Sequence, residues 1–393
     1  MTVSVETVKA VTLKYGNLEI PVPVVLAPMA GITNTAFRRI CREYGGGLFV
    51  SEMVTSRALV EGNAESFRLI RHHPSETVRS VQLYGVEPTT IAAAVRILID
   101  GNHADHIDLN FGCPVPKVTR KGGGAALPWK LGLFTAIVRA AVEAAGEVPV
   151  TVKMRKGIDD SHITYLDAAK SARDEGVAAI ALHARTAEQY YSGAADWEAI
   201  ARLKETVTDI PILGNGDIWS GADAVRMLRQ TGADGVVVGR GCLGRPWLFR
   251  ELETAVQEHF LGAHSAPRTN DDPPLGEVAR AFRRHGELLA EFFESEERGC
   301  RDLRKHVAWY FKGYPVGGEL RAALALSDSL EEIDRLLEQT YDSELVPSAA
   351  DGPRGRQGTP QRCALPEGWL ASRELEPADK SRIELAELSV SGG

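Results

Sequence analysis

Cysteine is scarce in this sequence and is poorly arranged for structural chemistry. The 393 residues contain five cysteines, an odd number, at widely separated positions. No Cys-x-x-Cys pair is present, and no group of cysteine and histidine has the spacing of a zinc site. These absences exclude a disulfide framework and a structural zinc module. They indicate free thiols in a reducing compartment, and we expect no bound metal.

Long apolar runs are missing as well. No stretch approaches the roughly 20 residues that a membrane-spanning helix needs. Residues 1–10 lack the basic start and apolar core of a signal peptide, so we expect a cytoplasmic protein with no membrane partner. The formal net charge of −8 argues against a protein that coats nucleic acid indiscriminately, and we expect no DNA partner. A local basic patch remains compatible with this charge.

The sequence does contain a regular alternation of short β-branched runs and longer amphipathic windows. Eight such pairs in about 240 residues predict a (β/α)8 TIM barrel. A doubly wound open sheet is the second choice, because no Gly-x-Gly-x-x-Gly motif follows the first strand. The expected strands cover residues 24–27, 48–50, 78–83, 106–109, 150–153, 178–183, 210–214 and 235–238. The expected helices cover residues 34–44, 52–71, 88–99, 130–145, 163–175, 197–206, 220–229 and 246–260.

The chain beyond the barrel changes in composition. Residues 263–275 are rich in Pro, Asn and Asp and predict a linker after a barrel domain at 1–262. Apolar residues at helical spacing predict a small all-helical domain at 276–341. Pro, Gly, Ser and charged residues dominate 342–393, where we expect a disordered tail.

The most informative stretch is 107–114, where an apolar strand pattern ends in a turn that presents Cys113. Parallel α/β proteins display their catalytic side chains at the carboxyl ends of strands. A thiol in that place can act as a nucleophile, act as a proton donor or have no chemical role. The position alone leaves these three possibilities open.

Other expected strands also end in polar side chains. Gln82 interrupts an apolar run and needs a partner, which the core or a ligand could supply. Lys153 would lie inside the barrel, where an anionic ligand is a better explanation than a structural ion pair. His183 could donate to an electron-rich ring, although a lone histidine is more often structural. We place Lys153 and His183 at equivalent positions on adjacent strands, which favours a shared ligand.

Glycine-rich turns follow the seventh and eighth strands. Barrels commonly bind phosphate there, because backbone amides converge on the anion and an arginine adds a charged donor. The residues of these turns are Asn215, Gly216 and Asp217, then Gly239, Arg240 and Gly241. Pro28, Met29 and Ala30 follow the first strand and offer a wall for a flat ligand. Together these ends suit a phosphorylated planar cofactor such as flavin mononucleotide (FMN), with pyridoxal phosphate as the weaker alternative.

These segments resemble those of the tRNA-dihydrouridine synthases. The resemblance covers residues 22–341 and is nearest to the bacterial B-type branch. The matching runs are LAPMAGITN at 26–34, SEM at 51–53, NFGCP at 110–114, YSGAADW at 191–197, GNGDI at 214–218 and GRG at 239–241. Two positions depart from the family's pattern, Phe111 in place of a common methionine and Ala184 in place of a glycine.

The resemblance implies an FMN enzyme that reduces the carbon 5–carbon 6 double bond of uridine in tRNA. NADPH would reduce the flavin, hydride would go to carbon 6, and Cys113 would protonate carbon 5. Gln82, Lys153, His183 and the residues at 28–30, 215–217 and 239–241 match flavin contacts. Asn110 and Arg185 match residues that face the uridine and its tRNA. A thiol of ordinary pKa stays protonated at pH 7, and no Cys/His pair is legible, so the chemistry agrees with a proton donor.

The helical domain carries a local basic group. Arg301, Arg304 and Lys305 fall near one helical face with Trp309, where they could contact phosphates and stack on bases. A solvated basic face with a core tryptophan is the plainer alternative. We expect tRNA as the partner and a monomeric protein. Two other functions compete, namely a flavin barrel acting on free pyrimidines and a non-catalytic RNA-binding protein.

Overall fold

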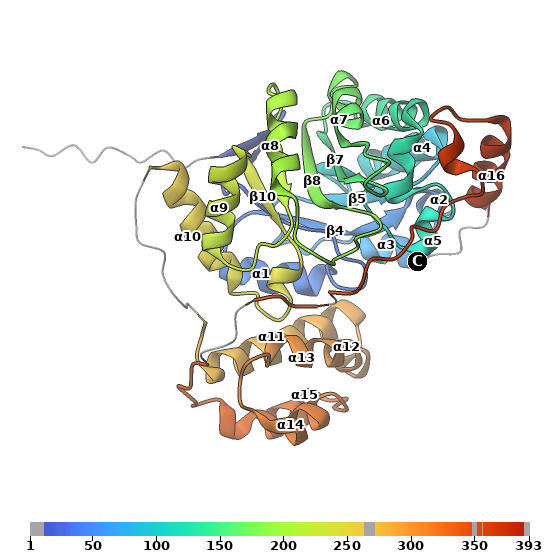
Figure 1. Cartoon of the computed structure of the whole chain (residues 1–393). Helices are drawn as coiled ribbons and strands as arrows, with labels where there is room; N and C mark the ends of the chain where they lie inside the picture. Colours follow the sequence, from blue (N-terminus) through green and yellow to red (C-terminus); the bar gives the residue numbers. More distant parts are fainter. Residues whose placement is uncertain (1–11, 263–271, 348–351, 356, 389–393) are drawn as a thin grey trace, which may run out of the picture.

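A computed structural model describes residues 12–262, 272–347, 352–355 and 357–388 (Figure 1). Eight parallel strands close into a barrel in the order β10-β3-β4-β5-β6-β7-β8-β9. This confirms the predicted TIM barrel and excludes the open sheet. The strands are β3 (Val24–Leu26), β4 (Leu48–Thr55), β5 (Ser80–Tyr84), β6 (His106–Phe111), β7 (Val150–Gly157), β8 (Ala179–Thr186), β9 (Ile212–Asn215) and β10 (Gly235–Val238).

Helices follow the strands and form the outer layer of the barrel. The long ones match the expected windows, and the irregular window at 52–71 resolves into two short helices. The helices of this layer are α1 (Thr35–Tyr44), α2 (Ser56–Val60), α3 (Ala64–Leu69), α4 (Pro88–Asp100), α5 (Pro116–Thr119), α6 (Leu131–Ala145), α7 (Tyr165–Asp174), α8 (Trp197–Thr206), α9 (Gly221–Thr231) and α10 (Leu248–Phe260). Short 3-10 turns, η1 (Gly124–Trp129) and η2 (Arg240–Cys242), follow β6 and β10.

Alternation along each strand gives the barrel two separate cores. Successive side chains of a strand point to opposite faces, so one set fills the barrel and the other meets the helices. On β10, Val237 belongs to the interior cluster, whereas Val236 and Val238 pack in the layer between strands and helices. The same rule decides which side chains at the strand ends point into the mouth of the barrel.

A β-hairpin that the sequence did not reveal closes the other end of the barrel. It pairs β1 (Leu13–Tyr15) with β2 (Leu18–Ile20). Tyr15 is buried, and its ring centroid lies 5.3 Å from that of His106 at the start of β6. The bottom of the barrel is therefore plugged, and the open mouth is at the carboxyl ends of the strands.

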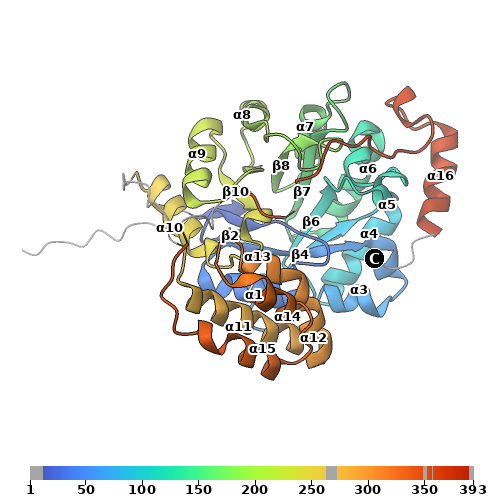
Figure 2. The same cartoon turned by 60° about the horizontal axis from the view of Figure 1, so that its bottom comes forward.

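The helices after the barrel form a separate unit (Figure 2). This unit has its own hydrophobic cluster. They are α11 (Leu275–Phe293), α12 (Glu296–Leu303), η3 (Arg304–His306), α13 (Val307–Tyr310), α14 (Gly317–Leu324), α15 (Leu330–Leu337) and η4 (Glu338–Thr340). Ala36 and Ile40 of α1, together with Trp247, share this cluster, so the unit docks on the barrel through apolar side chains. The predicted linker falls largely on residues 263–271, which lie outside the described residues.

The described part of the C-terminal segment is packed, which corrects the expected disorder of residues 342–393. Residues 352–355 and 357–388, here called the C-terminal strap, include η5 (Trp369–Ala371) and α16 (Pro377–Leu388). Figure 1 shows the strap, in red, running from the helical unit along the barrel to α16. Trp369 is only 1% exposed, and its Nε1 donates to the carbonyl of Ala126 at 3.0 Å.

A few isolated anchors hold this strap. The ammonium of Lys130 donates to the carbonyl oxygens of Ser372 and Glu374 at 3.0 and 2.8 Å and pairs with Asp379 at 2.8 Å. Such anchors leave no periodic pattern in the sequence, which is why the composition of this segment suggested disorder. Within the described parts of the chain, no helix is both long and apolar enough to cross a membrane.

Candidate active site

The inward positions of adjacent strands bring the predicted polar residues together at the mouth. Asn110 of β6 pairs in register with Lys153 of β7. Arg155, the next inward residue of β7, pairs with His183 of β8. Lys153 and His183 are therefore on adjacent strands, as predicted, but Lys153 lies one inward step deeper. The assumption of equivalent positions was wrong because the register between β7 and β8 cannot be read from apolar runs alone.

The turn that presents Cys113 is tightly held. The Oδ1 of Asn110 accepts hydrogen bonds from the backbone N–H groups of Gly112 and Cys113, at 3.0 and 2.9 Å. The carbonyl of Cys113 accepts from the N–H of Ala125 at 3.0 Å. Gly124 has φ +55°, and a Cβ there would lie 2.4 Å from the carbonyl oxygen of Cys113, so glycine is required at this close approach.

The environment of Cys113 favours the neutral thiol. Burial raises the pKa of this thiol, against the opposing effects of the Val115 N–H and of the charges on Arg155 and Lys153. No thiolate is stabilised enough to form readily at neutral pH, so the group holds a proton. The site therefore presents a protonated thiol rather than a ready nucleophile.

Arg155 connects the Cys113 turn to the loop after β8. Its guanidinium donates to the carbonyl oxygens of Gly112, Thr186 and Tyr190, at distances of 2.8 to 2.9 Å. The hydroxyl of Tyr190 donates a hydrogen bond to the carbonyl of Pro114 at 2.9 Å. Arg155 is 5% exposed, and sequence reasoning missed it. The strand alternation that placed Lys153 inward could have found it two residues later.

Positive charge accumulates around His183. Burial lowers the pKa of this imidazole well below its usual range, and Arg155, Lys153, Arg185 and Arg240 lower it further. Among the described residues, the Nδ1 of His183 has no hydrogen-bond partner although it is buried. Burial, with the nearby Arg155, also lowers the pKa of Lys153 to about 8. A neutral imidazole among four cations is an environment for an anionic ligand.

The loops after β9 and β10, where the sequence predicts a phosphate site, place an aspartate close to an arginine. Gly216 and Asp217 both have positive φ, +128° and +55°, and for the aspartate this is a strained backbone. Asp217 accepts from the N–H of Ala195 at 2.7 Å, and Arg240 lies 3.6 Å from its carboxylate. The guanidinium of Arg240 also stacks over the ring of Tyr191 at 4.2 Å. The side chain of Asn215 is occupied, because its Nδ2 donates to a β10 carbonyl at 2.7 Å.

Two residues expected to face the substrate have internal partners instead. Arg185 is 1% exposed, and its guanidinium pairs with Asp217 at 2.7 Å and donates to the carbonyl oxygens of Ser192 and Gly193. Asn110 uses its Oδ1 in the Cys113 turn and donates through Nδ2 to Gln82 at 2.9 Å. As placed, Arg185 is not an accessible tRNA contact, and its guanidinium positions Asp217.

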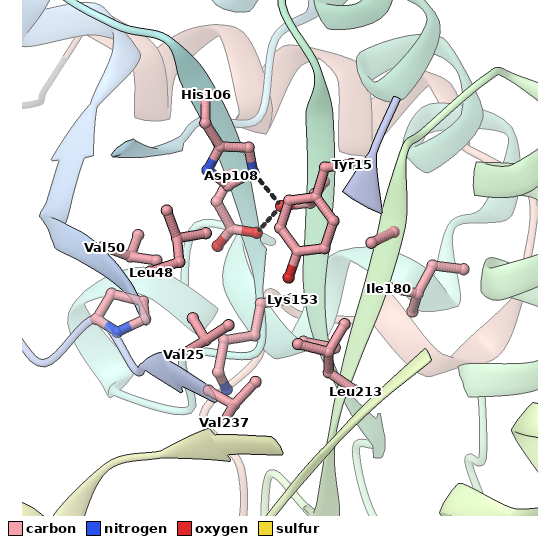
Figure 3. A pocket seen from close by; sticks show the side chains of 14 residues that line it. Tyr15, Val25, Leu48, Val50, His106, Asp108, Lys153, Ile180, Leu213 and Val237 are labelled. Atoms are coloured by element: carbon pink, nitrogen blue, oxygen red, sulfur yellow. Dashed lines mark hydrogen bonds between the residues drawn. The ribbon is translucent and has the colours of Figure 1, made fainter. Parts of the chain in front are cut away.

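The apolar wall lies where it was expected, on the β3 side of the mouth. Pro28 lines the internal pocket below the mouth. Lys153 lines the same pocket (Figure 3). A Cβ on Gly239 would lie 3.7 Å from the sulfur of Met29, so these two loops are neighbours. Ala30 is exposed. The predicted wall therefore borders both the lysine and the glycine-rich turn after β10.

The three basic residues predicted on the helical unit are not alike. Arg304 donates to the carbonyl oxygens of Leu326 and Ser327, within its own unit. Lys305 donates across to the carbonyl of Gly31 at 2.5 Å and pairs with Asp302 at 2.7 Å. It ties the helical unit to the loop after β3. Arg301 pairs with Glu297 of its own helix, but its side chain is 59% exposed, so it can still reach a large ligand.

Comparison with known proteins gives a consistent result. A model of the family described as "Dihydrouridine synthase (Dus)" matches residues 25–345. The chain is 53% identical over 390 residues to a probable tRNA-dihydrouridine synthase of Mycobacterium tuberculosis, with 97% of each chain covered. It is 37% identical over 322 residues to the tRNA-dihydrouridine synthase B of Pasteurella multocida, covering 82% of this chain and 93% of that one.

The family match ends at residue 345, before the strap, whereas the match to the mycobacterial protein covers 97% of the chain. A solved structure of morphinone reductase with tetrahydroNAD covers 66% of this chain and 92% of its own, at 12% identity and a TM-score of 0.46. That likeness adds nothing to the barrel seen directly in the strand order. From the family match and the identity to its relatives, we conclude that the chain belongs to the dihydrouridine synthase family.

Proposed function

We propose that this protein reduces uridines in tRNA to 5,6-dihydrouridine, with FMN as the bound cofactor and NADPH as the reductant. The observation that carries the proposal is the meeting of a protonated thiol, Cys113, with a cluster of buried cations at one barrel mouth. A proton donor and an anion site are the two parts that such a reduction needs. Family membership supports the choice of substrate.

The residues at the mouth fit a phosphorylated flavin. Two buried polar atoms, the Nδ1 of His183 and an Nη of Arg185, have no partner among the described residues. We infer that Lys153, His183 and Gln82 hold the ring. We infer that Arg240 and the turns at 215–217 and 239–241 hold the phosphate, where backbone amides and a guanidinium are suitable donors. When bound and reduced, FMN would supply the hydride that reaches carbon 6 of the uracil.

Cys113 completes the reduction in this proposal. As hydride arrives at carbon 6, electron density builds at carbon 5, and the Sγ–H of Cys113 delivers the proton that forms the second C–H bond. The thiolate left behind is stabilised by the charges of Arg155 and Lys153, the two groups that oppose the rise in the thiol's pKa. A proton from water then restores the thiol. Lys153 would hold a positive charge beside the bound ring and would offset the negative charge of its reduced form.

The helical unit supplies the second surface in this proposal. A uridine must leave its stack to enter a barrel mouth, and the rest of the tRNA must be held while it does so. Arg301 offers an exposed cation on that unit, while Lys305 fixes the unit against the loop after β3. We infer a tRNA that lies across both parts.

The test is a product assay with two substrates. The purified protein is examined for flavin absorbance, incubated with NADPH and either unmodified tRNA or free uracil, and the products are quantified by mass spectrometry. We expect yellow protein and dihydrouridine in tRNA, with no reduction of free uracil. Colourless protein that binds tRNA would contradict the proposal in favour of an RNA-binding protein. Reduction of uracil without tRNA would contradict it in favour of a free-pyrimidine reductase.

A further inference from the structure

One sector of the barrel interior is polar, although the rest is lined by aliphatic side chains. Val25, Leu48, Leu213 and Val237 are among the side chains that fill the apolar part. The polar sector comes from β5, β6 and β7, and Figure 3 shows part of it around Asp108. Its buried members are Ser80, Gln82, His106, Asp108 and Thr151.

One arm of this sector runs from the bottom of the barrel to Asp108. Thr151 donates its hydroxyl to Oδ1 of Asp108 at 2.6 Å, so its oxygen is left to accept from the Nε2 of His106 at 2.9 Å. The Nδ1 of His106 then accepts from Ser80 at 2.8 Å. Burial lowers the pKa of His106 to about 3, so the ring is neutral. It carries one proton, as this direction of hydrogen-bond donation requires.

The second arm runs from the mouth to the same carboxylate. A carboxylate only accepts, so Gln82 turns its Nε2 toward Oδ2 of Asp108, at 2.6 Å. The Oε1 of Gln82 therefore faces Asn110 and accepts from its Nδ2 at 2.9 Å. The Oδ1 of Asn110 is left for the N–H groups of Gly112 and Cys113. Every donor of both arms points toward Asp108.

We propose that Asp108 is a positioning residue for the reaction, because its ionised carboxylate fixes the orientation of two side-chain amides and, through them, the Cys113 turn. The inference rests on the proposed function for its consequence in turnover, but the geometry of the turn can be measured separately. Asp108 touches neither substrate nor cofactor in this role. It acts through Gln82 and Asn110.

A carboxylate with no role beyond packing would be unfavourable at this buried position. Burial raises the pKa of Asp108 to about 6, against its hydrogen bonds from Thr151 and Gln82 and the charge of Lys153. The ionised form is thus disfavoured by its surroundings, and a neutral side chain would be easier to bury. What only the ionised form provides is two acceptors that face two donors.

The titration of Asp108 should be visible in the reaction. When it takes up a proton, one of its oxygens becomes a donor and one arm must reverse. The other ionisable groups that face it are Lys153, His106 and Tyr15. The pKa of Lys153 is about 8, that of His106 is about 3 and that of Tyr15 is raised, so of these four groups Asp108 is the one that titrates near pH 6. We expect turnover to fall as the pH drops through about 6.

The test exchanges a donor and an acceptor between two positions. In D108N, an amide donor faces either Gln82 or Thr151, and we expect kcat with saturating tRNA to fall at least about tenfold. In Q82E, two carboxylates face each other, and kcat falls as well. In the double variant the new amide donates to the new carboxylate, which still accepts from Asn110. We therefore expect the double variant to exceed each single variant in kcat, and the acid limb near pH 6 to change.

A second measurement on the same variants needs neither substrate nor cofactor. The rate of Cys113 alkylation by iodoacetamide reports the turn directly, and we expect it to change about threefold or more in D108N and to return toward the wild-type rate in the double variant. Ser80→Ala, which removes only the far end of the other arm, is the control and should leave both measurements within about twofold. If D108N alone folds poorly, recovery in the double variant still tests the inference.

Two results would overturn the inference. One is a double variant whose losses in kcat and changes in alkylation are the product of those in the single variants, because independent sites multiply in this way. The other is a D108N protein with the wild-type kcat and an unchanged acid limb. A wild-type protein that makes no dihydrouridine would instead contradict the proposed function, and the alkylation rates would still decide the role of Asp108.

Discussion

Lys153 carries its charge inside the barrel, where burial and the neighbouring Arg155 lower its pKa to about 8. Folding lowers this pKa, so below about pH 8 the charged ammonium destabilises the folded protein by about 3 kcal/mol. This amount corresponds to about 1.4 kcal/mol for each pKa unit. The destabilisation disappears as the pH rises through the window between the two pKa values. A charge held at such a loss indicates a role with an anionic ligand.

This predicts a basic limb in flavin reduction. We expect the rate of flavin bleaching by NADPH in stopped-flow experiments to fall as the pH rises through about 8, because the cation beside the ring is lost. Lys153→Arg should move this fall to higher pH, because arginine stays charged there. Lys153→Met should be slower by roughly tenfold or more, with no limb near pH 8. An unchanged limb in Lys153→Met would show that another group titrates.

At the residue scale, period-two alternation was enough to place Gln82, Lys153 and His183 inside the barrel. It could not supply the hydrogen-bond order, because that order depends on register. Asp108 becomes the centre of the interior network only when β6 is paired with β5 and β7. The same alternation could have placed Arg155 inside, two residues after Lys153, but its partners are carbonyl oxygens in loops distant in sequence and could not be predicted.

The C-terminal strap acts as an element that supports the loop after β6. A Cβ on Gly122 would lie 2.6 Å from the ring of Trp369, so the indole packs directly on this loop. The N–H of Gln361 donates to the carbonyl of Glu188 in the loop after β8, at 2.9 Å. The strap therefore contacts both loops that Arg155 holds together next to Cys113.

Trp369→Ala should loosen this element. Removing a buried tryptophan destabilises by about 3–5 kcal/mol where the surroundings cannot collapse, and here the loss falls on the strap and the loop beneath it. We expect faster hydrogen exchange and proteolysis in residues 357–388 and in η1, with flavin content retained and turnover reduced. Lys380→Ala, at an exposed site on α16, is the control. Unchanged exchange in η1 would show that the strap does not support the loop.

At the element scale, all eight barrel strands were predictable because each is a short apolar run followed by an amphipathic window. The β1–β2 hairpin was not, because strands of three residues are shorter than any periodic window. The strap was missed because its anchors, such as Trp369 and Asp379, are single residues whose partners lie on the barrel.

The whole molecule joins a barrel with a charged mouth to a helical unit that docks beside it. The docking depends on the shared apolar cluster and on Lys305, which reaches the loop after β3. These docking contacts explain why Arg301, Arg304 and Lys305 have different surroundings although all three are basic. Composition could predict a helical unit, but not which of its cations would be used in docking. Of the three tRNA contacts predicted on the helical unit, Arg301 is the one whose side chain is mostly exposed.

In the proposed flavin-dependent reduction of tRNA uridine, Cys113 supplies the proton. The most direct measurement is a single turnover, in which enzyme reduced beforehand by NADPH is mixed with tRNA and reoxidation of the flavin is followed. We predict that Cys113→Ala keeps its flavin and its reduction by NADPH but is reoxidised by tRNA about 10²–10⁴-fold more slowly, the usual contribution of a general acid. Cys300→Ala, which removes a buried thiol from the helical unit, should behave as wild type. Reoxidation of Cys113→Ala at the wild-type rate, with dihydrouridine formed, would contradict the account.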